Sequence, residues 1–166
     1  FMTQKYRLDK EGYINRKKSI SFKFNGKKYF GYEGDTLASA LLANGIHLVG
    51  RSFKYHRPRG FIGAGVDEPN AKVQLYIKGK TEPNAVATEI ELVDGLKAKS
   101  QNCWPSVNFD FGAINNLLYK FFPAGFYYKT FMWPKSFWYK VYEPFIRKAA
   151  GLGVASIKHD KERYEH

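Results

Sequence analysis

An alternation of apolar and polar residues that begins at Ser19 is the feature that most constrains the fold. Ile20, Phe22 and Phe24 are apolar and the residues between them are polar, which is the period of a strand with one buried face. Asn25-Gly26 follows, a pair that readily adopts the positive φ angles of a type I′ turn. Residues 28–32 then predict the returning strand. A β-hairpin is therefore expected near the start of the domain.

A short helix is predicted directly after this hairpin. Its apolar positions, at spacings of three to four residues, are Leu37, Ala38, Leu41 and Leu42. Asp35 or Thr36 can cap its first turn, and Asn44-Gly45 is a typical helix end. Hairpin and helix together begin an α+β unit.

Two further strands are predicted from residues 72–78 and 86–93, both of which alternate apolar with polar residues. Asp94-Gly95 closes the second one with a turn. The order strand, strand, helix, loop, strand, strand can wrap a mixed sheet around one helix. The fold class that we predict is accordingly α+β.

A basic loop separates the helix from the second pair of strands. The segment 50–65 contains three glycines after its proline, which makes it a loop. Its basic and imidazole side chains are Arg51, Lys54, His56, Arg57 and Arg59. We predict that this set docks another domain or binds an anion. Arg57 and Arg59 are the main candidates, because a guanidinium group can bind carboxylate or phosphate through two parallel hydrogen bonds.

The charge of the chain leaves a second function open. With 27 Lys and Arg against 15 Asp and Glu, the formal net charge is +12, which suits an independent basic module that binds nucleic acid or anionic surfaces. The standard recognition motifs for nucleic acid are absent from the sequence. Oligonucleotide binding that is tight and falls steeply with salt would support this alternative, and negligible binding at physiological salt would oppose it.

The residues after 103 form an aromatic extension. Helices are predicted over 112–122 and 136–152, interrupted by prolines. The aromatic residues that we expect to pack against a partner are Phe126, Tyr127, Tyr128, Phe131, Trp133 and Trp138. A self-contained helical core is the alternative. Gly151-Leu152-Gly153 is interpreted as a helix C-terminus, because a dinucleotide fingerprint follows a strand.

The residue types that perform catalysis are scarce. Cys103 is the one cysteine, and the four histidines stand too far apart to suggest a metal site. A structural role is predicted for His56, and Cys103 is expected to be a small buried hydrophobe. The sequence therefore predicts no catalytic residue and no metal ligand in this chain. No apolar run is long enough for a membrane span, and a cytoplasmic location is expected.

Several stretches, in order along the chain, resemble the alpha subunit of heterotetrameric sarcosine oxidase. They are GRSFKYHRPRGFIGAG (50–65), DEPNA (67–71), DGL (94–96), SQN (100–102), WPS (104–106), FPAGFYYKTFMWP (122–134) and YEPFIRKAAGLG (142–153). The resemblance implies a ferredoxin-like β-grasp module, related to a [2Fe-2S] domain. Cluster-bearing relatives place cysteines in the stretch that corresponds to 63–71, which here has none.

The resemblance also implies a domain plan and a function. We expect a basic N-terminal arm (1–18), a β-grasp domain without cluster cysteines (19–102), and an aromatic extension (103–166) that leads toward a dinucleotide-binding domain. The chain is expected to be a structural module without a cofactor of its own. In the implied full complex, FAD, FMN and NAD serve the oxidation of sarcosine to glycine. The one-carbon unit passes to tetrahydrofolate or leaves as formaldehyde, with hydrogen peroxide as a product.

The implied partners are the remaining alpha-subunit domains and the other sarcosine oxidase subunits, and neither nucleic acid nor membrane is expected under this resemblance. A working electron carrier is a third possibility. Stoichiometric uptake of a cluster during anaerobic reconstitution would support it. The single cysteine opposes it, because four thiolates are the usual requirement.

Overall fold

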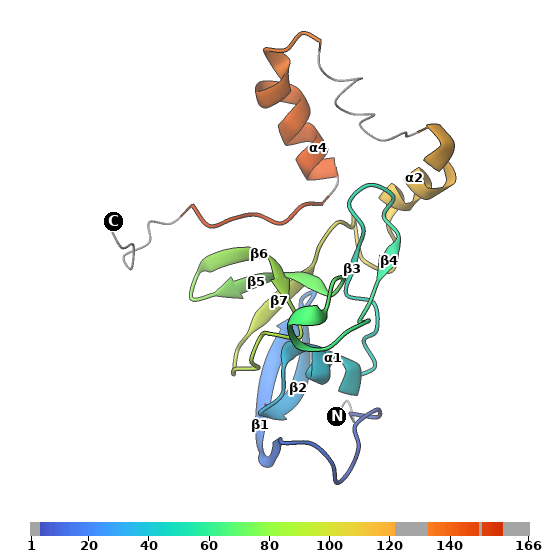
Figure 1. The fold of residues 1–166 in the computed structure, drawn as a ribbon. Coiled ribbons are helices and arrows are strands. Elements are labelled where there is room, and N and C mark those ends of the chain that lie inside the picture. Colours follow the sequence, from blue (N-terminus) through green and yellow to red (C-terminus); the bar gives the residue numbers. More distant parts are fainter. Residues whose placement is uncertain (1–3, 122–132, 150, 158–166) are drawn as a thin grey trace.

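A computed structural model describes residues 4–121, 133–149 and 151–157 (Figure 1). The described part is built on a five-stranded sheet with the strand order β2-β1-β7-β5-β6. The strands are β1 (Asn15–Phe24), β2 (Lys27–Glu33), β5 (Lys72–Ile77), β6 (Lys80–Val86) and β7 (Lys97–Ser100). β1 and β7 pair in parallel, and the other neighbours pair antiparallel. With helix α1 (Leu37–Ala43), this mixed sheet confirms the predicted α+β, β-grasp class.

The hairpin that the alternation predicted is present. Asn25 and Gly26 form its turn with φ angles of 49° and 81°. Phe22 and Phe24 are almost completely buried in the core, as the period of two requires. β1 begins at Asn15, before the expected Ser19, and its register shifts between these two residues.

Helix α1 is only seven residues long and buries most of its surface. Thr36, and not Asp35, is its N-cap: the Thr36 hydroxyl accepts from the Ser39 N–H, and the Ser39 hydroxyl accepts from the Thr36 N–H. The side chains that pack into the core are Leu37, Ala38, Ala40, Leu41 and Ala43. Because so short a helix is unstable alone, the cap and this packing together hold it in place.

We expect Thr36→Ala to lower the free energy of unfolding by about 1 kcal/mol, because the N–H of Ser39 loses its acceptor. Urea denaturation of the chain measures the loss. Thr36→Ser is the matched control, since it keeps the hydroxyl and should retain most of the stability. Equal stability of Thr36→Ala and wild type would contradict this assignment of the cap.

The prediction of a strand at residues 86–93 is wrong. β6 ends at Val86, and of residues 87–93 only Glu91 pairs, in an isolated bridge with Thr36. β6 instead begins at Lys80 and contains Pro83, which an edge strand tolerates because one side of its backbone faces no partner. β7 was not predicted at all. Its sequence KAKS buries only Ala98 and Ser100, so it lacks a strongly apolar face.

The basic loop contains a second, smaller sheet, in which β3 (Gly50–Arg51) pairs with β4 (Pro58–Arg59). A single 3₁₀ turn, η1 (Gly65–Asp67), follows. The loop is therefore more regular than the glycines and proline suggested.

The helices predicted after β7 are only partly confirmed. Instead of one helix over 112–122 there are short turns: η2 (Phe111–Ala113), α2 (Ile114–Leu117) and η3 (Tyr119–Phe121). The second prediction agrees better, with a π-helical turn η4 (Trp138–Tyr142) followed by α4 (Glu143–Ala149). Among the described residues, no helix has the length and apolar character to cross a membrane.

Gly151 ends α4 as predicted. It has a φ of 66°, its N–H donates to the Lys148 carbonyl, and the Leu152 N–H donates to Arg147. The chain then runs back toward the sheet (Figure 1). There the Val154 N–H donates to Gln74 Oε1 at 2.7 Å and Gln74 Nε2 donates to the Val154 carbonyl at 3.1 Å. The end of the extension is thus bonded to β5.

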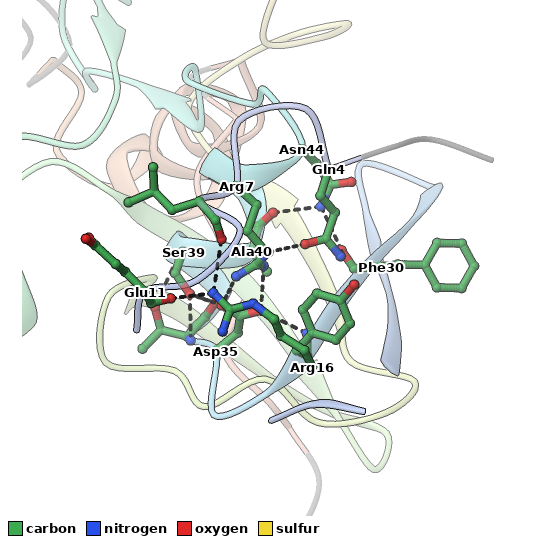
Figure 2. A network of polar contacts seen from close by, with 12 residues as sticks. Gln4, Arg7, Glu11, Arg16, Phe30, Asp35, Ser39, Ala40 and Asn44 are labelled. Carbon is green, nitrogen blue, oxygen red and sulfur yellow. Dashed lines mark hydrogen bonds and ion pairs between the residues drawn. The ribbon is translucent and has the colours of Figure 1, made fainter. Parts of the chain in front are cut away.

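Part of the N-terminal segment is bonded to the domain through Asp35 (Figure 2). The Arg7 guanidinium donates to both carboxylate oxygens, at 3.0 and 2.6 Å. Asp35 also accepts from the Tyr32 N–H at 2.8 Å and from the Ser39 hydroxyl at 2.7 Å. The basic segment 1–18 as a separate unit stays a prediction, but its residue Arg7 bonds to Asp35, between β2 and α1, and lies 5.1 Å from the ring centre of Tyr32 in β2.

Candidate functional site

The candidate site is the basic loop, together with the segment that follows β7. Arg51, in β3, points inward and its side chain is 10% exposed. Its Nε donates to the Val107 carbonyl at 2.8 Å, and its Nη1 donates to the His56 carbonyl at 2.8 Å. The structure therefore uses Arg51 to join the loop to residues 103–113.

Asp110 is the buried acceptor at the centre of this junction. One carboxylate oxygen lies 2.7 Å from His56 Nδ1 and 3.5 Å from Arg51 Nε. The other accepts from the N–H groups of Trp104, at 2.9 Å, and Gly112, at 3.1 Å. We call Arg51, His56 and Asp110 the Asp110 cluster. His56 thus has a hydrogen-bond partner of the kind that a structural role requires, and its docking or anion-binding role stays a prediction.

Gly112 is required beside this cluster for a steric reason. A Cβ atom on Gly112 would lie 2.3 Å from the nearest atoms of the His56 ring. His56 itself has a φ of 52°, a backbone conformation that is uncommon for a residue with a side chain. The tight packing keeps the imidazole directed at Asp110.

The other three predicted loop residues lie nearer the surface. Arg57 is exposed, donates from Nε to Asn116 Oδ1 at 2.8 Å and lies 4.9 Å from the centre of the Tyr55 ring. Lys54 lies 4.9 Å from the same ring centre. Arg59 is half-buried and donates to Asn70. Of the predicted anchors, Arg57 is thus better placed than Arg51 or His56 to meet another molecule.

Glu68 is a buried carboxylate three residues after the basic loop, 2% exposed. Its Oε2 accepts from the N–H groups of Ile62 and Gly63, both at 2.7 Å. Its Oε1 accepts from the N–H groups of Asn70, at 2.7 Å, and Ala71, at 3.0 Å. Burial raises the pKa of Glu68, but the four N–H donors outweigh burial and leave the pKa below its ordinary value.

The lowered pKa has a consequence for stability. A carboxyl group whose pKa is lower in the folded than in the unfolded state stabilises the fold above its unfolded pKa. The stabilisation by Glu68 is therefore present at neutral pH and is lost as the pH falls through its folded-state pKa.

The aromatic residues predicted to meet a partner are mostly outside the described residues: Phe126, Tyr127, Tyr128 and Phe131. Trp133 is exposed and Trp138 is half-buried. The structure adds a group that the sequence did not single out, the aromatic triad Trp104, Phe109 and Phe111. Its ring centres are 5.2 Å apart for Trp104 and Phe111, and 5.1 Å apart for Phe109 and Phe111. All three side chains are more than half exposed.

Cys103 lies at the start of this segment and is partly buried. Burial raises the pKa of its thiol, and the nearby Asp110 charge raises it further. Because the thiolate is the nucleophilic and metal-binding form, both effects disfavour such a role for Cys103, which is less buried than the sequence predicted.

Sequence reasoning missed Glu68 and Asp110, although each carried a signal. Glu68 and its neighbour Asp67 are the acidic residues of the glycine-containing stretch 60–71, and Asp110 stands between two phenylalanines. A carboxylate that is buried among apolar neighbours needs hydrogen-bond or ionic partners. The partner of Asp110 at His56 is 54 residues away, so no local spacing could have identified it.

Comparison with known proteins agrees with the resemblance. Residues 17–103 match the family described as a 2Fe-2S iron-sulfur cluster binding domain. The chain is 61% identical over 160 residues to the sarcosine oxidase subunit alpha of Rhizobium meliloti (strain 1021), covering 96% of this chain and 16% of that protein. The sarcosine oxidase subunit alpha of Corynebacterium sp. (strain U-96) is 39% identical over 88 residues, covering 51% of this chain and 9% of that protein.

Among solved structures, the crystal structure of L-proline dehydrogenase from P. horikoshii matches with a TM-score of 0.41 and 30% identity, covering 55% of this chain and 17% of that one. The chain spans 16% or less of the length of the two alpha subunits above.

Proposed function

The chain belongs to the family of 2Fe-2S iron-sulfur cluster binding domains, and on this premise we propose that it is a structural, non-catalytic module of a sarcosine oxidase alpha subunit. The 61% identity to the Rhizobium meliloti alpha subunit supports this assignment. The full enzyme would oxidise sarcosine to glycine and form hydrogen peroxide, with the one-carbon unit passing to tetrahydrofolate or leaving as formaldehyde. FAD, FMN and NAD would be bound by its other segments and subunits.

The residues present do not fit a [2Fe-2S] cluster. Such a cluster is held by four cysteine thiolates, or by two cysteines and two histidines, and the chain has one cysteine. Within residues 4–121, 133–149 and 151–157, no group of three or more His, Cys, Asp or Glu side chains could hold a metal ion. The N–H groups inside the loop already bond to Glu68. We therefore assign no electron-transfer step to this chain.

The observation that carries the proposal is the division of the candidate site into an inner and an outer part. The inner side chains, the Asp110 cluster and Glu68, bond to the chain itself. The outer part consists of Arg57 and the aromatic triad, which are exposed. Both parts flank the same junction, because His56, the neighbour of Arg57, lies 2.7 Å from Asp110, which stands between Phe109 and Phe111. An exposed arginine near exposed aromatic rings is a typical composition for a protein interface.

The partner surface would be another part of the alpha subunit or a neighbouring sarcosine oxidase subunit. Arg57 would pair with a carboxylate there, and the triad would pack against apolar side chains. The described part of the extension, with Trp133 exposed, would contribute to the same assembly, as would the aromatic residues that lie outside the described residues.

The test is assembly of the full-length alpha subunit with its partner subunits. We expect the double variant Arg57→Ala/Phe109→Ala to weaken assembly by about tenfold or more, because central Arg and aromatic side chains commonly contribute over 1 kcal/mol each. Mass photometry over a dilution series measures assembly, and flavin absorption measures the cofactor content.

Lys17→Ala/Tyr13→Ala is the matched control. It removes one exposed cation and one exposed aromatic side chain from the N-terminal segment, and it should assemble like wild type. Unchanged assembly and flavin content in Arg57→Ala/Phe109→Ala would refute the docking role.

A further inference from the structure

We propose that the Glu68 carboxylate is the built-in anion of the loop 61–71, and that it organises the backbone N–H groups which, in a cluster-bearing member of this family, would face the iron-sulfur cluster. The proposal rests on the family assignment and on the contacts of Glu68. It does not depend on the docking role of the outer surface, and the two are tested by different measurements.

The first argument is geometric. Glu68 uses both carboxylate oxygens, and each accepts two backbone N–H groups, with every N to O distance between 2.7 and 3.0 Å. The donors come from two places: Ile62 and Gly63 precede the turn η1, and Asn70 and Ala71 follow it. The carboxylate therefore ties the beginning of the loop to its end.

The second argument concerns what such a set of donors requires. Backbone N–H groups that converge on one point form a concave site for an anion, a geometry shared by many phosphate and iron-sulfur sites. Without an acceptor, each buried N–H group costs free energy comparable to a lost hydrogen bond. Cluster sulfur atoms accept hydrogen bonds where a cluster is present. Here the chain supplies the acceptor from its own residue Glu68.

The third argument is that the loop packs closely against neighbouring backbone. A Cβ atom on Gly63 would lie 2.9 Å from the Asp67 carbonyl oxygen, and one on Gly60 would lie 2.5 Å from the carbonyl oxygen of His47. Ala71 is completely buried, and its carbonyl accepts from the Ala87 N–H at 2.9 Å. Glu68 thus fixes the loop directly onto the core of the domain.

A neutral side chain of the same size should not replace Glu68. A glutamine has one oxygen acceptor, and its NH₂ group is a donor that would face two of the N–H groups. We expect Glu68→Gln to accelerate hydrogen exchange of the amides of Ile62, Gly63, Asn70 and Ala71 by about tenfold or more, since their opening becomes easier. Amides of β1 should be much less affected. Hydrogen exchange followed by NMR measures this in the 166-residue chain.

Asp67→Asn is the matched control. Asp67 is the exposed neighbour in the same loop, so its variant loses the same charge while the acceptor at Glu68 remains, and the four amides should exchange as in wild type. In Glu68→Ala, added formate should slow their exchange again, and an equal concentration of chloride should not. Wild-type exchange rates in Glu68→Gln would overturn the proposal, and so would the absence of a formate effect.

If these variants do not fold, a measurement on the wild-type chain decides whether Glu68 accepts hydrogen bonds from the four amides. Scalar couplings across the hydrogen bonds should connect the ¹⁵N nuclei of the four amides to the ¹³Cδ nucleus of Glu68. Observation of these couplings would support the assignment of Glu68 as the acceptor, and their absence would overturn it.

Discussion

Replacing Asp35 by alanine is expected to lower the free energy of unfolding by about 3–5 kcal/mol, the cost of leaving a buried charge without its partner. The Arg7 guanidinium would lose both of its bonds to the carboxylate, and the Tyr32 N–H and the Ser39 hydroxyl would lose an acceptor. Arg7 is itself largely buried, so water cannot fully replace the carboxylate. Urea denaturation followed by circular dichroism measures the change.

Asp9→Ala is the control for this prediction, because Asp9 is an exposed acid of the same segment. We expect its effect to be within about 0.5 kcal/mol of wild type, as for most surface substitutions. A loss for Asp35→Ala as small as that of the control would show that the bond between Arg7 and Asp35 does not hold the N-terminal segment to the domain.

Replacing Asp110 by alanine is expected to have an effect of similar size, about 3–5 kcal/mol. Arg51 and His56 would lose their shared acceptor, and the N–H groups of Trp104 and Gly112 would lose theirs. The basic loop would then no longer be held against residues 103–113. Besides lower stability, we expect faster cleavage by trypsin after Arg51, Lys54 and Arg59; the bond after Arg57 resists trypsin because Pro58 follows it.

Glu89→Ala is the control for Asp110→Ala, since Glu89 is an exposed acid outside the loop. Its denaturation midpoint and its trypsin cleavage pattern should match those of wild type. If Asp110→Ala keeps both the stability and the protease resistance of wild type, the Asp110 cluster is not what closes the loop.

The elements that were predicted correctly are those whose signals are local. The hairpin of β1 and β2 combines a period of two with Asn25-Gly26, and α1 combines apolar spacing with the cap at Thr36. β7 escaped prediction because its position depends on pairing with β1 and β5, which lie far away in the sequence. The polar sequence KAKS becomes a central strand only because both neighbours offer hydrogen bonds to it.

In the candidate site, too, local sequence signals identified the segment, but contacts between distant residues determined its structure. The basic loop was found from its composition, but its side chains have different roles that composition cannot distinguish. Arg51 and His56 lie inside and bond to the chain, whereas Arg57 lies on the surface. Which of them faces inward depends on Asp110, a residue that follows β7 in the chain and bonds to His56.

The amino-acid sequence alone was sufficient to determine that the chain cannot supply four thiolates, because the number of cysteines does not depend on the fold. It also determined the hairpin and the first helix, whose hydrophobic periods and turn residues act over a few residues. The tertiary structure decided which charges are buried and with which partners they pair. Burial and pairing join residues that are distant along the chain, as Arg7 with Asp35 and Asp110 with His56, and only the folded chain brings such groups within hydrogen-bond distance.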